Sequence, residues 1–218
     1  MGTAPLYGLR VRTPRLELRL GSQEELVALG HLAERGVHPP HEMPFAVAWS
    51  DRIGEPDFLA DFVAFHERHL ADWSPDSWDL NLLVWARGEL AGTQGIFANQ
   101  FADRRWVGTG SWLGRDYQGR GLGTEMRAAV LELAFRGLGA VAAESTWLED
   151  NEASRRVSEK LGYRETGIGT KSPRGYPVPE HGVEIERAAW HCPMPVEIAG
   201  LEPCLPLFGL SEEPSAPA

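Results

Sequence analysis

The chain has 218 residues, of which 43% are apolar and 24% charged, and its formal net charge at pH 7 is −10. The length allows one large domain or two small ones, and the composition is ordinary for a globular protein. The acidic balance disfavours nucleic acid and anionic membranes as partners. No apolar run is long enough to span a membrane and residues 1–14 lack the apolar core of a signal peptide, so we expect a cytoplasmic protein.

The N-terminal third predicts one strand and two helices. Arg15 to Leu20 alternates apolar and charged residues, which is typical of a half-buried strand. Ser22 and Glu25 have the spacing of a capping box at the start of a helix. Between this helix and a second one over 57–73, the segment 37–49 is rich in proline and large apolar side chains. A loop of this length is usually functional or packs as an insertion.

The middle and end of the chain predict a sheet with further helices. Three antiparallel strands are expected over 78–86, 90–98 and 106–113, the first two joined by a tight turn at residues 87–89. The later elements are a helix over 121–136, a strand over 140–147, a helix over 151–161, and strands over 163–168 and 183–190 separated by a proline-rich loop. This order predicts a single α/β domain, in which a mixed sheet combines an antiparallel meander with a strand–helix–strand unit.

The two ends of the chain lie outside this pattern. We place the domain at residues 10–192, a C-terminal arm or extra strand at 193–210, and a disordered tail at 211–218. An arm of this kind would join subunits, so we expect a homo-oligomer. Cys192 and Cys204 have no second pair nearby to form a zinc site, and we expect free thiols and no bound metal.

A glycine-rich segment stands between the third meander strand and the following helix. Glycine occurs at every second position of residues 118–124, and a helix-forming run follows at once. Glycine permits tight bends and close approach of a ligand, and the first N–H groups of a helix have no internal partner. The segment therefore predicts a cradle for a phosphate or pyrophosphate. It has neither the P-loop pattern nor the βαβ context of a dinucleotide fingerprint, and the alternative is a plain strand-to-helix turn.

Three segments together resemble one enzyme family. Q-G-R-G-L-G-T at 118–124 resembles the Q/R-x-x-G-x-G/A signature of the GNAT N-acyltransferases. N-E-A-S-R-R-V-S-E-K-L-G-Y at 151–163 resembles a helix of the RimJ/RimL-like branch, and T-P-R-L-E-L-R at 13–19 resembles its opening strand. The resemblance extends over about residues 10–190, and the chain as a whole is similar to an actinobacterial transferase that uses succinyl-CoA.

The resemblance implies acyl-CoA, as acetyl-CoA or succinyl-CoA, as the cosubstrate. Backbone N–H groups of the glycine loop would hold its pyrophosphate, and the strand over 110–113, splayed from its neighbour, would pair with the pantetheine arm. The residues implied in cofactor binding are Trp112, Leu113, Gln118, Gly119, Arg120, Gly121, Leu122, Gly123, Thr124, Asn151 and Ser154. For Asn151 a simple helix N-cap is the alternative.

The resemblance also implies catalytic roles. The backbone N–H of Ser111 or Trp112 would face the thioester carbonyl as the oxyanion donor. Ser158 stands where the family usually has a tyrosine that protonates the leaving thiolate, and an ordinary helix serine is the alternative. Glu144 is a candidate base because burial in its apolar surroundings would raise its pKa, although a solvent-facing strand residue is the alternative. Further base candidates are His38, His41, Asp150 and Glu184.

The expected acyl acceptor is a primary amine of a small molecule. A protein N-terminal or lysine amine is the alternative, and a non-catalytic CoA-binding module is a third hypothesis. A succinyl group would need a cationic or hydrogen-bonding end to its pocket, for which Arg104 and Arg105 are available. Neither nucleic acid nor a membrane is expected as a partner.

Overall fold

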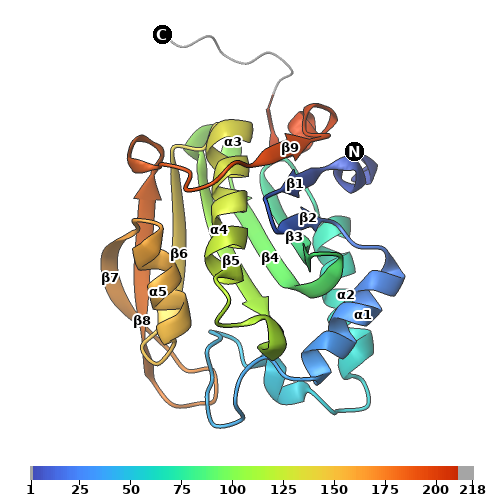
Figure 1. Cartoon of the computed structure of the whole chain (residues 1–218), viewed down its shortest axis with the longest axis vertical. Coiled ribbons are helices and arrows are strands. Elements are labelled where there is room, and N and C mark those ends of the chain that lie inside the picture. The colour runs from blue at the N-terminus through green and yellow to red at the C-terminus, as the bar shows by residue number, and fades with distance from the viewer. Residues whose placement is uncertain (1, 211–218) are drawn as a thin grey trace.

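A nine-stranded mixed sheet forms the centre of the computed structural model, which describes residues 2–210 (Figure 1). The strand order is β7-β8-β6-β5-β4-β3-β2-β1-β9, and only the β5–β6 pair is parallel. One apolar core lies between the sheet and α4, and a second lies between the opposite face and the helices α1 and α2. The predicted single α/β domain with a mixed sheet is therefore confirmed.

The N-terminal elements follow local sequence signals. They are β1 (Arg10–Arg12), β2 (Leu16–Arg19), α1 (Gln23–Glu34) and α2 (Phe58–Ala71). The capping box is present, because Ser22 Oγ accepts from the N–H of Glu25 at 3.3 Å and the Glu25 carboxylate accepts from the N–H of Ser22 at 2.9 Å. The three-residue strand β1 was not predicted.

The remaining elements contain one correction to the expected strands. They are β3 (Ser77–Ala86), β4 (Glu89–Asn99), α3 (Phe101–Arg104), β5 (Trp106–Leu113), α4 (Leu122–Glu132), β6 (Ala142–Leu148), α5 (Glu152–Lys160), β7 (Arg164–Lys171), β8 (Val178–Glu186) and β9 (Glu197–Ala199). Strand β8 begins inside the segment expected to be a loop and ends before Trp190. The reason is that β8 pairs with β7 over 178–184 and with β6 over 180–186, which outweighs the loop signal of Pro179. No helix in residues 2–210 is long and apolar enough to cross a membrane.

A wedge opens in the middle of the sheet. Strands β5 and β6 pair only from Trp106–Ala142 to Gly108–Glu144. Beyond that point β5 stays paired with β4 as far as Leu113, while β6 follows β8 as far as Leu148. The two strands therefore separate, as was expected for the strand over 110–113, and the wedge between them positions the site described below.

Residues 193–210 complete one edge of the sheet. Strand β9 pairs with β1, and the segment after it buries Phe208 completely. The Phe208 ring lies 4.8 Å from the ring of Trp78 and 5.4 Å from that of Trp73, measured between centroids. The segment is thus an extra strand and a core element of its own chain. The disordered tail expected at 211–218 lies outside the described residues.

Candidate active site

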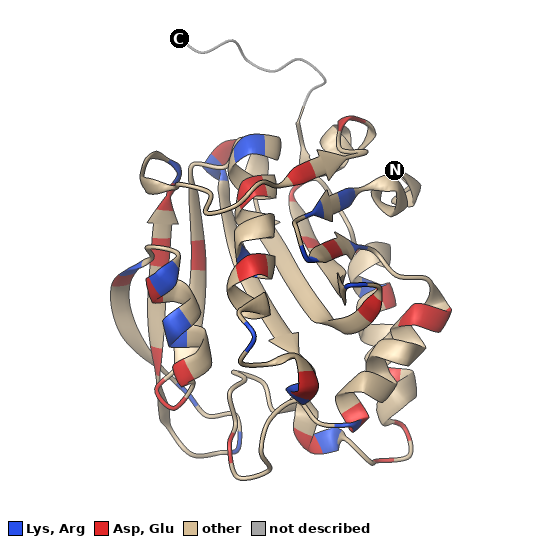
Figure 2. Cartoon of the chain, viewed as in Figure 1, with Lys and Arg blue, Asp and Glu red and all other residues tan. Residues whose placement is uncertain are grey.

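A cleft of about 410 Å³ occupies the wedge between β5 and β6. The C-terminal ends of these two strands lie toward the lower edge of the sheet in Figure 1. The walls of the cleft come from β5, β6, the first turns of α4 and α5, and the loop over 37–49. The volume lies in the range of small-molecule sites. Strand β5 carries no charged residue, so the charges near the cleft come from flanking elements (Figure 2).

The glycine loop presents free donors at the mouth of this cleft. Gly119 and Gly121 have φ angles of 71° and 76°, which glycine adopts without strain. Within residues 2–210, the six N–H groups from Gly119 to Thr124 donate no hydrogen bond, and Glu125 N–H is the first to bond, to the carbonyl of Gly121 at 3.2 Å. A Cβ at Gly119 would meet no atom within 4 Å, so a ligand has room. Free donors at the positive end of α4 have the geometry of a phosphate cradle.

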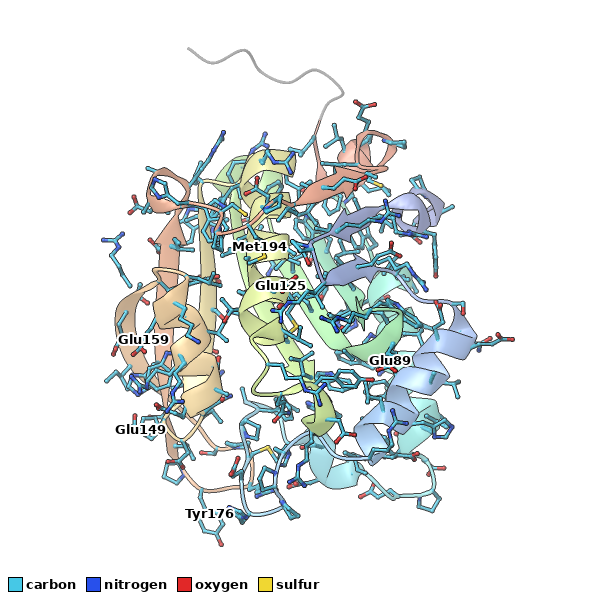
Figure 3. The ribbon with its side chains drawn as sticks, viewed as in Figure 1. Glu89, Glu125, Glu149, Glu159, Tyr176 and Met194 are labelled. Carbon is cyan, nitrogen blue, oxygen red and sulfur yellow. The ribbon has the colours of Figure 1, made fainter. Side chains whose placement is uncertain are left out.

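A buried carboxylate anchors the cradle from behind. Glu125, on the first turn of α4, is 3% exposed and is labelled in Figure 3. It accepts from Thr13 Oγ1 at 2.6 Å, from the Arg15 N–H at 3.1 Å and from Arg15 Nε at 2.6 Å. Arg15 Nη1 also donates to the carbonyl of Arg120 at 3.0 Å. The T-P-R segment therefore fixes both the glycine loop and the helix start.

The direction of the β5 backbone identifies the donor inside the wedge. The Thr109 carbonyl accepts from Ser145 Oγ at 3.0 Å, and the Leu113 carbonyl accepts from Gln118 Nε2 at 2.8 Å. The backbone carbonyls of both residues therefore point away from β4. Because backbone groups alternate sides along a strand, Ser111 also directs its N–H and carbonyl into the wedge. Of the two predicted oxyanion donors, this geometry favours Ser111.

Trp112 instead anchors the proline-rich loop. Its backbone belongs to the β4 side of β5, and its ring lies 5.6 Å from that of Trp49 and 6.3 Å from that of Phe62. The Phe45 ring lies 5.1 Å from that of Trp49, tilted by 35° to it, and Phe45 lines the cleft. The loop over 37–49 is thus packed as a roof over the cleft.

Two polar contacts hold this roof in place. The Asn151 carbonyl oxygen caps α5 by accepting from Ser154 N–H at 3.0 Å, while its Nδ2 donates to the carbonyl of Pro44 at 3.1 Å. Arg174, in the β7–β8 turn, donates to the carbonyl of Pro40 in the loop at 3.3 Å and, just beyond the loop, to both oxygens of Asp51 at 2.6 and 2.8 Å. This bond keeps the pKa of Asp51 below its ordinary value. Asn151 is therefore an N-cap that also ties the roof to α5.

The predicted residues divide between the cleft, its mouth and other places. Those that line the cleft are Ser111, Trp112, Leu113, Gln118, Gly123, Asn151 and Ser154. Those that form the loop and helix start at its mouth are Gly119, Arg120, Gly121, Leu122 and Thr124. The remaining two do not line the cleft. Glu144 is exposed on β6, in agreement with the solvent-facing alternative and not with the burial that the base role needs, and the buried Ser158 donates to the carbonyl of Ser154 at 3.1 Å.

A carboxylate that the sequence analysis missed lines the cleft. Glu180 on β8 pairs in register with Leu148, its side chain is 16% exposed, and its nearest cation is Lys171 Nζ at 3.8 Å. The alternation of acidic or small residues with apolar ones over 178–186 is a strand signal that would have found it.

A buried cation also lines the cleft. Arg127 on α4 is 3% exposed; its Nη1 donates to Ser145 Oγ at 3.0 Å, and its Nη2 lies 3.4 Å from Ser111 Oγ. Arg104 and Arg105, which the sequence offered for this role, lie at the far end of β5 beside Trp106 and Leu138.

One wall carries a stacked pair of rings. The rings of His181 and Trp147 lie parallel, 3.8 Å apart, and Trp147 lines the cleft. The pKa of His181 is raised by its hydrogen bond to Glu149 and, to a smaller extent, by its hydrogen bond to Glu165. Among the described residues, no three His, Cys, Asp or Glu side chains are grouped to hold a metal ion.

Comparison with known proteins gives a family and several similar folds. The family model described as an acetyltransferase (GNAT) domain matches residues 15–164. Mycobacterium smegmatis RimJ in complex with CoA-disulfide is 17% identical, with a TM-score of 0.66 over 93% of this chain and 95% of that one. RimL, a ribosomal L7/L12 α-N-protein acetyltransferase in complex with CoA, is 16% identical, with a TM-score of 0.63 over 80% and 95%. The microcin C7 self-immunity acetyltransferase MccE, in complex with acetyl-CoA and AMP, is 16% identical, with a TM-score of 0.60 over 79% and 93%.

Proposed function

Because the chain belongs to the GNAT acetyltransferase family and is therefore a CoA-using acyltransferase, we propose that it transfers an acetyl or succinyl group to a primary amine. The observation that carries this proposal is the wedge between β5 and β6, which has free backbone donors at its mouth and inside it. A pyrophosphate at the glycine loop and an extended arm along β5 use both sets of donors.

The chain's own residues supply the chemistry of the transfer. The amine nitrogen attacks the thioester carbonyl carbon, so that a C–N bond forms and the C–S bond breaks. Ser111 N–H donates to the carbonyl oxygen as negative charge develops on it. Glu180 takes the proton that frees the amine lone pair, because an alkyl ammonium is the dominant form at neutral pH and cannot attack. A second proton passes from the amine nitrogen to the departing thiolate.

Most residues predicted from the sequence for the base and the acid fit this scheme less well. His38 does line the cleft, but both of its ring nitrogens already make hydrogen bonds within the protein. Glu144 is on the same strand as Thr146, which lines the cleft, but is itself outside it. Ser158 would have to turn its hydroxyl away from the carbonyl of Ser154 to reach a thiolate. We therefore assign the base to Glu180 and give Ser158 a supporting place in α5.

The acceptor end of the cleft favours a compact cationic amine. Glu180 and Glu42 both line it, and the loop over 37–49 covers it. The alternative acceptor is the N-terminal or lysine amine of a protein, and the α-N-protein acetyltransferase activity of RimL supports an N-terminal amine by analogy. We favour the small molecule because the loop is tied down at both Asn151 and Arg174 and leaves a limited space beneath it. A homo-oligomer in the cytoplasm remains part of this proposal.

The test is release of free thiol from acetyl-CoA and from succinyl-CoA, each with a panel of small amines. We expect turnover with at least one pair, and no new acylation of lysate proteins by mass spectrometry. Absence of turnover with every amine, together with clear CoA binding, would leave a CoA-binding module. Acylation confined to lysate proteins would instead establish the protein acceptor.

A further inference from the structure

The guanidinium of Arg127 has no anionic partner in the described part of the chain. No Asp or Glu oxygen of residues 2–210 lies within 4.0 Å of it, and its Nε has no acceptor at all. Its two contacts are neutral serine hydroxyls, and Ser145 Oγ already donates to the carbonyl of Thr109. A charge that is 97% buried is normally paired with an opposite charge, because loss of its hydration is otherwise uncompensated. The three free donors of this group therefore call for an anion that the chain does not supply.

The position of this cation is the vertex of the wedge. Its partners Ser111 and Ser145 come from the two strands that separate, just beyond the last pair, Gly108 with Glu144. Arg127 lies one helical turn beyond Gly123 and lines the cleft. It is therefore inside the wedge, whereas the free donors of the glycine loop are at its mouth.

We propose that Arg127 is a carboxylate-binding site that recognises the far end of a short dicarboxylic acyl group carried on CoA. This inference rests on the proposed function, in which Ser111 N–H holds the thioester carbonyl. Arg127 Nη2 lies 3.4 Å from the Ser111 hydroxyl, so an acyl chain that extends from that carbonyl passes the guanidinium within a few atoms. A planar fork of donors matches a carboxylate in two-point contact, whereas a methyl group gives it nothing to bind.

A carboxylate on the acceptor amine is the other source of such an anion. The register of β6 argues against this source, because it places an acceptor bound at Glu180 on the face of the sheet opposite to Arg127. Ser145, which contacts Arg127, and Leu148, which pairs with Glu180, are an odd number of residues apart, so their side chains point to opposite faces. The acceptor is drawn to the Glu180 face, and the anionic chain to the α4 face.

The first test compares binding of free CoA, acetyl-CoA and succinyl-CoA to the full chain by calorimetry without amine. We expect succinyl-CoA to bind at least about 10-fold more tightly than acetyl-CoA, as a charge-assisted hydrogen bond pair allows. Malonyl-CoA and glutaryl-CoA then define the chain length. Equal affinities for acetyl-CoA and all three dicarboxylic forms would overturn the proposal. If no form of CoA binds, the proposed function itself fails; if CoA forms bind without selectivity, the inference alone fails.

The second test uses variants of the cation. Arg127→Met should abolish the preference for succinyl-CoA over acetyl-CoA and leave the affinity for free CoA unchanged. Arg127→Lys should keep part of this preference. Arg104→Met, an exposed arginine outside the cleft, is the matched control and should keep all of it. Because the described part of the chain gives Arg127 no anionic partner, Arg127→Met should melt at or above the wild-type temperature. If Arg127→Met bound free CoA, acetyl-CoA and succinyl-CoA with equally reduced affinity, the assignment to the acyl end would be contradicted. Loss of activity only with carboxylate-bearing amines would contradict it as well.

Discussion

Two side chains of opposite charge, Arg127 and Glu180, face the cleft and are largely withdrawn from water. Electrostatic interactions are stronger at such positions than at the surface, because less solvent screens them. The cleft therefore has a cationic side, beneath α4, and an acidic side, on β8. This polarity suits an anionic acyl chain and a cationic amine that meet at Ser111.

Replacement of Glu180 tests the assigned base. Glu180→Gln removes the proton acceptor with little change of shape, and we expect kcat to fall about 100-fold or more while CoA affinity is kept. The difference in kcat between Glu180→Gln and the wild type should become smaller at high pH, because the free amine becomes abundant there. Steady-state rates across pH measure this, and Glu186→Gln, an exposed residue on the same face of β8, is the control. Full activity of Glu180→Gln would show that the base lies elsewhere.

His66 gives the fold a defined response to acid. It is 6% exposed, its Nδ1 has no partner, and burial lowers its pKa to about 4. Between about 4 and the ordinary value of 6.5 the unfolded chain binds a proton that the folded chain does not, so stability falls as pH falls through this window. At 1.36 kcal/mol per pKa unit, the loss is about 3 kcal/mol.

The comparison of His66→Leu with the parent isolates this effect. The pKa values of His69 and His181 are raised by Asp79 and Glu149, so these two act in the opposite direction, but they are present in both proteins. Urea unfolding between pH 4.5 and 7.5 should show a flatter pH dependence for the variant. Identical slopes would mean that His66 is protonated in the folded state.

The free N–H groups of the glycine loop could be predicted because they depend on local spacing. Glycine at 119, 121 and 123 before a helix is enough to specify free N–H groups. Glu180 and Arg127 could not be predicted in this way, because their burial depends on strands and helices far apart in the sequence. The exposure of Glu144 has the same origin: an apolar neighbourhood in sequence does not determine which face of β6 a side chain takes.

At the scale of elements, β2 and α4 act as one unit through Glu125. Its carboxylate accepts hydrogen bonds from both Thr13 and Arg15, and Arg15 reaches on to the glycine loop. This contact gives the T-P-R segment a physical role that the sequence alone did not provide.

Glu125→Gln should therefore affect both stability and CoA binding. The amide removes the charge and one acceptor from an ion pair in which Glu125 is buried and Arg15 is partly exposed, which we expect to destabilise the fold by about 1–3 kcal/mol and to weaken CoA binding. Chemical denaturation and calorimetry measure the two effects. Glu159→Gln, in an exposed pair with Arg155, is the control and should cost less than about 1 kcal/mol. An unchanged denaturation midpoint for Glu125→Gln would refute the anchoring role.

Elements with local signals were the predictable ones. The capping box of α1, the β3–β4 hairpin and the Asn151 cap of α5 are each specified within a few residues. Strands β1 and β9 are three residues long and exist because they pair with each other and with β2. The two strands are far apart in the sequence, and a segment of three residues is too short to show the alternation that predicts a strand.

At the scale of the whole molecule, the C-terminal segment closes the core. Cys204, Leu207 and Phe208 are at most 1% exposed and pack against the cluster that contains Trp73 and Trp78. A chain that ends at Cys192 should lose cooperative thermal unfolding, because deletion of one buried aromatic side chain alone costs about 3–5 kcal/mol. A chain that ends at residue 210 is the control. An unchanged melting curve for the shorter chain would show that this segment is dispensable.

The most direct test of the whole account is calorimetric titration of CoA into the protein and two glycine variants. Gly123→Trp places an indole at the cradle beside Val157, whereas Gly8→Trp places one at an exposed site where a Cβ has free space. We predict binding of CoA to the wild type and to Gly8→Trp with equal affinity, and no measurable heat with Gly123→Trp. Absence of binding heat with the wild type, or wild-type CoA affinity of Gly123→Trp, would contradict the account.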